Sequence, residues 1–120
     1  GKKGGTVWGV YADGTPAAAW KSMGKWKSFL CGTPLVQSHI LRALSRKAGC
    51  HVYSESDDPL YVNSSFIGMH TASEGEKRLV FPFPVTVHDA FSGKEVVHNT
   101  REVRLSLPKH ETVLFCWQQV

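Results

Sequence analysis

The feature that most constrains the fold of this chain is a change in the spacing of its apolar residues near residue 50. Beyond that point apolar and polar residues alternate, as in the run Arg101-Glu102-Val103-Arg104-Leu105-Ser106-Leu107. Alternation gives a strand one apolar face, because successive side chains of a strand point to opposite sides. Turn residues recur between these segments at intervals of about ten residues, which is typical of an antiparallel β-sandwich. We expect strands at residues 7–12, 17–23, 26–31, 50–53, 60–62, 65–70, 77–83, 85–91, 95–98, 101–107 and 112–117.

One segment has helical spacing instead. From Val36 to Ala48, apolar residues recur at every fourth position, which places them on one face of a helix. Thr33 is the expected N-cap, Pro34 suits the first helical position, and Gly49 suits the position after the last turn. The sequence therefore predicts a mainly β (α+β) fold: an antiparallel β-sandwich-like domain with one packed α-helix over about 34–48.

The chain has 120 residues, the size of one ordinary domain. We interpret residues 1–5 as an expression tag or a linker, 6–56 as a strand-hairpin plus helix unit, and 57–120 as the antiparallel sandwich. The two larger parts are expected to form one compact domain. Apolar runs are only a few residues long, so we predict no membrane span, and no secretory signal peptide opens the chain.

Charge and cysteine content narrow the classes of partner. The net charge of +4 is modest and its positive residues are spread along the chain, so no nucleic-acid partner is predicted. Cys31, Cys50 and Cys116 are odd in number, have no CxxC spacing and lie in apolar, strand-like runs. We therefore expect buried free thiols, which slightly favours a reducing compartment such as the cytoplasm and otherwise leaves the localisation open.

The polar residues form no recognisable catalytic or metal motif. The six histidines match no zinc spacing, and Asp57-Asp58 lacks the alternating oxygen ligands of a calcium loop. Glycoside hydrolysis needs two facing carboxylates, and the acidic residues here fall in turns or in expected edge strands. We predict no catalytic residue, no metal and no cofactor. A small autonomous hydrolase that uses His70 or His88 with an acidic partner is kept as an alternative.

Aromatic residues cluster at the start of the chain: Trp8, Tyr11, Trp20 and Trp26. One interpretation is a hydrophobic joint between the hairpin and a sheet, or a patch that meets another domain. The alternative is a carbohydrate-binding module in which these rings stack on sugars. Asn63-Ser64-Ser65 also fits the glycosylation acceptor pattern.

The order of motifs resembles the C-terminal region of family 42 β-galactosidases and related large glycoside hydrolases. "GKWKSFLCGTP" followed by "ILRALSRKAG" resembles the end of their class-I amidotransferase-like trimerisation domain. The stretch from His51 to Trp117, with Val87-His88-Asp89-Ala90-Phe91-Ser92-Gly93 inside it, looks like the small β-sandwich that closes such chains. The resemblance extends over roughly residues 14 to 117.

The resemblance implies a function for the chain but transfers no catalytic residue, since the catalytic glutamates of these enzymes lie in an N-terminal barrel. It implies a non-catalytic C-terminal accessory or structural domain of a larger carbohydrate-active enzyme. The expected partner is a neighbouring domain of the parent enzyme or a second copy of the chain, with carbohydrate as the alternative. Cys50 departs from the family, where a β-branched residue is usual, and so does the tryptophan-rich start.

Overall fold

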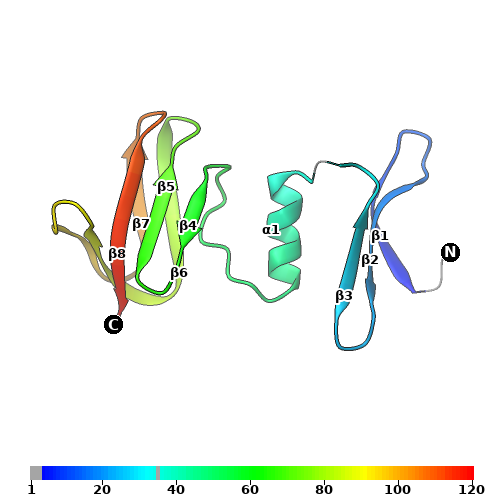
Figure 1. Ribbon diagram of the computed structural model, residues 1–120, viewed down its shortest axis with the longest axis horizontal. Helices are drawn as coiled ribbons and strands as arrows, with labels where there is room; N and C mark the ends of the chain where they lie inside the picture. Colours follow the sequence, from blue (N-terminus) through cyan, green and yellow to red (C-terminus); the bar gives the residue numbers. More distant parts are fainter. Residues whose placement is uncertain (1–3, 35) are drawn as a thin grey trace. The chain divides into compact units, whose positions relative to one another are not determined.

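The computed structural model of the chain describes residues 4–34 and 36–120. It divides into two compact units, Gly1–Gln37 and Ser38–Val120, which we call the N-terminal and C-terminal units (Figure 1). The described residues form two antiparallel sheets and a single helix. The predicted fold class, a mainly β, sandwich-like α+β fold, is confirmed.

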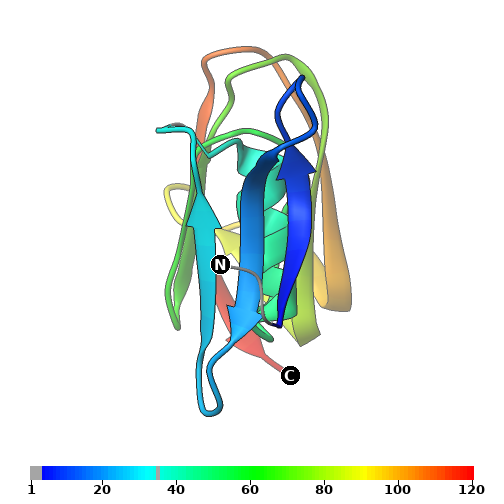
Figure 2. The ribbon, with the colours of Figure 1, turned by 90° about the vertical axis from the view of Figure 1, so that its right-hand side faces the viewer.

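The N-terminal unit is a three-stranded antiparallel sheet. Its strands β1 (Gly5–Val10), β2 (Pro16–Ser22) and β3 (Lys27–Cys31) follow one another in the order β1-β2-β3, as Figure 2 shows in blue to cyan. The turn between β1 and β2 is fixed by Asp13, whose Oδ1 accepts hydrogen bonds from the Thr15 backbone N–H at 2.9 Å and hydroxyl at 2.7 Å. Short polar side chains stabilise turns in this way.

The C-terminal unit contains a five-stranded antiparallel sheet in the order β4-β5-β8-β6-β7. Its strands are β4 (Leu60–Val62), β5 (Phe66–His70), β6 (Gly75–Asp89), β7 (Glu95–Leu107) and β8 (Thr112–Gln119). Each of β6 and β7 joins two strands that we predicted separately. The predicted strand at 50–53 is wrong: this segment is irregular.

The ladder between β6 and β7 is interrupted, and this shapes the core. Val80 pairs with Glu102 and Val85 with Thr100, so four residues of β6 lie opposite one of β7. Two of the four are prolines, which cannot donate to a ladder and are tolerated at such irregularities. Side chains before and after the interruption both enter the core, so the sheet curves around it and gives the sandwich-like arrangement.

The core consists of apolar side chains from the four strands β5 to β8. Its centre is aromatic: the Phe81 ring lies 5.5 Å from the Trp117 ring and 5.7 Å from the Tyr53 ring. Tyr53 belongs to the irregular segment after the helix, and its carbonyl accepts a hydrogen bond from Val80 N–H at 2.8 Å. The buried hydrophobic residues are Ile67, Met69, Leu79, Phe81, Val85, Val87, Val103, Phe115 and Trp117.

The helix α1 spans Ser38–Lys47, so the predicted start near Pro34 is wrong and its predicted end is nearly correct. Gly49 has a positive φ of 84°, and the Cys50 N–H donates to the Ser45 carbonyl at 2.9 Å. These are the features of the C-terminal glycine motif that we predicted.

The start of α1 is set by a residue outside the helix. The first turn contains no acidic side chain, and Asp57 supplies one: it accepts hydrogen bonds from the Ser38 hydroxyl at 2.6 Å and from Arg42 at 2.8 Å. These bonds lower the pKa of Asp57, with Ser38 contributing most. A carboxylate near a helix N-terminus is stabilising, so the helix begins where Asp57 meets it.

Polar contacts attach α1 to its unit. None of the residues in α1, all of which the structure describes, is buried. Arg42 and Arg46 form ion pairs with Glu55 and Asp57.

The cysteines also differ from the prediction: all three are free, but Cys50 is exposed and the other two are half-buried.

Candidate functional site

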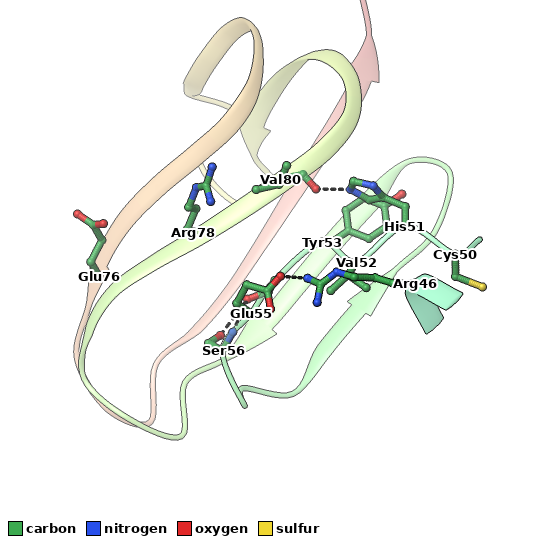
Figure 3. Close-up of a pocket in the computed structure, with 11 residues that line it drawn as sticks. Arg46, Cys50, His51, Val52, Tyr53, Glu55, Ser56, Glu76, Arg78 and Val80 are labelled. Atoms are coloured by element: carbon green, nitrogen blue, oxygen red, sulfur yellow. Dashed lines mark hydrogen bonds and ion pairs between the residues drawn. The ribbon is translucent and has the colours of Figure 1, made fainter. Parts of the chain in front are cut away.

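A hollow of about 480 Å³, lined by both charged and apolar side chains, lies beside the C-terminal end of α1 (Figure 3). Arg46, the segment from Cys50 to Ser56, and three residues of β6 line it. The His51 Nε2–H donates to the Val80 carbonyl at 2.7 Å, and the His51 ring packs edge-on against Tyr53 with centroids 4.6 Å apart. These contacts hold the segment after the helix against β6.

The charged groups of this hollow are paired, either within the hollow or with side chains of β7. Arg46 forms an ion pair with Glu55, and Arg78 lies 2.5 Å from Glu102 on the neighbouring strand. Hydrogen bonds from Arg78 and then from Arg104 lower the pKa of Glu102 to about 2. Carboxylates held this way stay ionised and are poor general acids, so the geometry indicates a structural network.

The four aromatic residues singled out in the sequence all lie in the N-terminal unit. The Trp8 ring packs edge-on against Phe29 with centroids 5.7 Å apart. Phe29 pairs with Trp20 on the next strand, so Trp20 lies on the same face, with Lys27 above its ring at 5.9 Å. Trp8 is in β1, so its ring reaches Phe29 of β3 across the intervening strand β2.

The remaining two aromatic residues lie at opposite ends of β2. Tyr11 follows β1 beside the first turn, and its hydroxyl lies over Gly32. Trp26 is in the turn between β2 and β3, with 58% of its surface exposed. Seven residues of strand separate the two ends, roughly 23 Å at the rise of a strand. The structure therefore places the four rings at three positions along the sheet, and carbohydrate binding by them stays a prediction.

This spacing leads to a first prediction. Saturating neutral oligosaccharide is expected to leave the tryptophan fluorescence of the 120-residue chain unchanged, because Trp8 packs edge-on against Phe29 and Tyr11 and Trp26 lie at opposite ends of β2, so the four rings form no continuous stacking surface. The measurement is a fluorescence titration of the chain and of its Trp26→Ala variant. A saturable shift that disappears in Trp26→Ala would establish the aromatic platform instead.

The histidines kept for a hydrolase lie on the sheet surface. His70 Nδ1 is 2.8 Å from the Thr112 hydroxyl. His88 has an acidic neighbour in Glu95 at 3.9 Å, and the same carboxylate lies 3.5 Å from His98. Among residues 4–34 and 36–120, no three His, Cys, Asp or Glu side chains are grouped so that they would hold a metal ion. The described helix α1 also lacks the length and apolar content needed to cross a membrane.

A second hollow was missed in the sequence. It lies on the outer face of β4, β5 and β8, has a volume of about 570 Å³, and is largely apolar. The sequence signal that could have indicated this hollow is the series Tyr61, Phe66 and Gly68, which occupy outward-facing positions of the strands. Alternation identifies which residues share a face, but it does not reveal that this face stays uncovered.

Comparison with known proteins gives one informative result. No protein-family model and no curated protein sequence matches the chain. Among solved structures, the chain is similar to Gan42B, a GH42 beta-galactosidase, with a TM-score of 0.57 and 23% sequence identity. The fold of the chain is therefore similar to that of part of this solved structure. The similarity covers 97% of this chain and 18% of the Gan42B chain, so it supports the resemblance at the level of fold.

Proposed function

We propose that the chain is a non-catalytic accessory domain of a larger carbohydrate-active enzyme of the β-galactosidase kind. The observation that carries the proposal is the fold similarity, which extends over 97% of this chain but only 18% of Gan42B. In this proposal the catalytic groups lie elsewhere in the parent enzyme. The role of the chain is to bury apolar surface against a neighbouring domain or subunit.

The N-terminal unit supports this role through an uncovered apolar face. Val7, Ala19 and Leu30 pair across the three strands, so their side chains share one face. Val7 is 50% exposed and Leu30 is 75% exposed. None of the described residues of this unit is fully buried. A small sheet needs a covered hydrophobic face for stability, and exposed apolar patches mark interaction surfaces.

The second prediction tests this face. The 120-residue chain, taken without its parent enzyme, is expected to self-associate as its concentration rises, because two copies cover each other's Val7 and Leu30. Leu30→Lys should abolish the association, since a charge on this face must otherwise be desolvated. Thr6→Lys, on the opposite face of β1, is the matched control and should associate like the unchanged chain. Sedimentation equilibrium measures the difference.

Three outcomes would count against the proposal. A chain that stays monomeric at every concentration would remove the evidence for a covering partner. Turnover of a nitrophenyl β-galactoside by the purified chain, abolished by a single acidic substitution, would make it an autonomous hydrolase. The coding sequence that precedes Gly5 is an independent test, because a barrel domain encoded there supports the accessory role and a start codon contradicts it.

A further inference from the structure

The outer hollow of the C-terminal unit has a floor without a side chain. Tyr61, Gly68 and Leu114 pair across β4, β5 and β8, so they share one face of the sheet. This face points away from the core, because the neighbouring residues Ile67 and Phe115 point into it. Gly68 therefore leaves a depression between the Tyr61 and Leu114 side chains, with a volume of about 570 Å³.

Aromatic rings form the walls of this depression. Tyr61 is 76% exposed, Phe91 is 80% exposed and Phe66 is 42% exposed. All three line the hollow. Phe91 is held by the turn after β6, where the Asp89 carboxylate accepts hydrogen bonds from the backbone N–H groups of Phe91 at 3.0 Å and of Ser92 at 2.7 Å. Open aromatic faces on a defined scaffold are ready to stack on a ligand without a large loss of entropy.

One end of the hollow carries polar side chains from β5 and β8. His70 Nδ1 and the Thr112 hydroxyl lie 2.8 Å apart, on paired positions of β5 and β8. Asn63 contributes an amide near Phe66, although its Oδ1 already accepts two backbone hydrogen bonds. The lining contains no Asp, Glu, Lys or Arg, whereas 20% of the chain is charged. A charged ligand would find no carboxylate, ammonium or guanidinium partner in this lining, which favours a neutral occupant.

We propose that this hollow binds a pyranose unit of a neutral carbohydrate. A sugar ring has an apolar C–H face, which fits Tyr61 and Phe91, and a rim of hydroxyl groups, which fits the His70–Thr112 pair. The volume lies in the usual range of about 300–1,000 Å³ for small-molecule sites, which combine apolar walls with a few polar groups. The site lies in the C-terminal unit and is separate from the tryptophans of the N-terminal unit. It gives the chain a binding activity beyond its proposed structural role.

The experiment is a titration of the whole 120-residue chain, with lactose, cellotetraose and a galactan oligosaccharide as separate probes. Backbone amide NMR signals of Gly68, Val113 and Leu114 are expected to shift saturably with at least one probe. Tyr61→Ala and Phe91→Ala should each weaken binding about tenfold, the loss expected for a stacking contact. Tryptophan fluorescence should stay constant, because no tryptophan lines the hollow.

Gly68→Val is the sharper variant, because it adds an isopropyl group to the floor of the hollow and leaves every aromatic ring in place. A Cβ at this position meets only Leu114 Cδ1 at 3.4 Å and the Val113 carbonyl at 3.6 Å, so the strand accommodates it. Binding should be lost while the amide signals of the core stay unchanged. Trp26→Ala is the control and should bind normally.

Three results would overturn this proposal. They are the absence of a saturable shift with any probe, binding that survives Gly68→Val, and self-association that is lost in Tyr61→Ala. The third would show that a second copy of the chain occupies the face. The Leu30→Lys experiment concerns the other unit, so a failure of the accessory role and a failure of sugar binding are distinguishable.

Discussion

Lys77→Ala is expected to lower the free energy of unfolding of the C-terminal unit by about 3–5 kcal/mol. Lys77 Nζ lies 2.8 Å from Asp58 Oδ2, and the two side chains are 4% and 1% exposed. Lys77 also donates to the Ser73 hydroxyl at 3.0 Å, and Asp58 Oδ1 accepts the Ala72 N–H at 2.7 Å. Removing the ammonium leaves a buried carboxylate without its counter-charge, which costs far more than the loss of an exposed pair.

The neighbouring residue offers a matched control. Arg78 pairs with Glu102 on the surface, where the Arg78 side chain is 53% exposed, so Arg78→Ala should cost only about 0–1 kcal/mol. Amide hydrogen exchange at Val87 and Phe115 measures the opening of the core in both variants. Equal costs for the two variants would show that the buried pair is not a stabilising element.

The same pair predicts how stability depends on pH. Burial raises the pKa of Asp58, but hydrogen bonds from Lys77, Ser56 and the Ala72 N–H outweigh it and lower the pKa from 3.8 to about 2. The folded state therefore binds this proton less readily than the unfolded state does. The stabilisation of about 2.5 kcal/mol is fully present above the unfolded pKa, near 4, and is lost as the pH falls through about 2. Lys77→Ala should reduce this acid dependence, which unfolding curves between pH 6 and about 2 would show.

The sequence predicted the elements whose signals are local. The alternation that ends at Leu107 and the Gly49 terminus of the helix depend on neighbouring residues, and both predictions are confirmed. The continuity of β6 was missed because Pro84 was taken to interrupt the strand, as proline normally does. In this sheet Pro82 and Pro84 lie where the ladder to β7 is interrupted, so the strand continues through them.

The contacts that attach the helix and stabilise the core could not be predicted from such local signals. Asp57 and Asp58 appeared as one acidic turn, but they face different partners: Asp57 meets the start of α1 and Asp58 meets Lys77. Such partners are distant in the sequence, and only the folded chain brings them together. The outer hollow has the same origin, because Phe91 reaches Tyr61 and Gly68 only through the order of the strands.

Phe81→Ala is expected to destabilise the C-terminal unit by about 3–5 kcal/mol, the usual cost of truncating a buried phenylalanine. Phe81 is 1% exposed and lies between Tyr53 and Trp117, with ring centroids 5.7 and 5.5 Å away. It comes directly after the last residue of β6 that pairs before the interruption, Val80. A cavity there removes contacts to the irregular segment after the helix and to β8 at the same time.

Thermal unfolding of the whole chain measures this loss. For a unit of this size, a loss of 3 kcal/mol or more corresponds to a fall in Tm of at least about 12 °C. Phe91→Ala is the matched control: its ring is 80% exposed, so its Tm should stay within about 4 °C of that of the unchanged chain. Similar Tm values for the two variants would mean that the curved sheet repacks around the cavity. Interiors collapse only partially around a deleted side chain, so we expect a clear difference between the two Tm values. The aromatic centre around Phe81 would then be what keeps the two halves of β6 in one core.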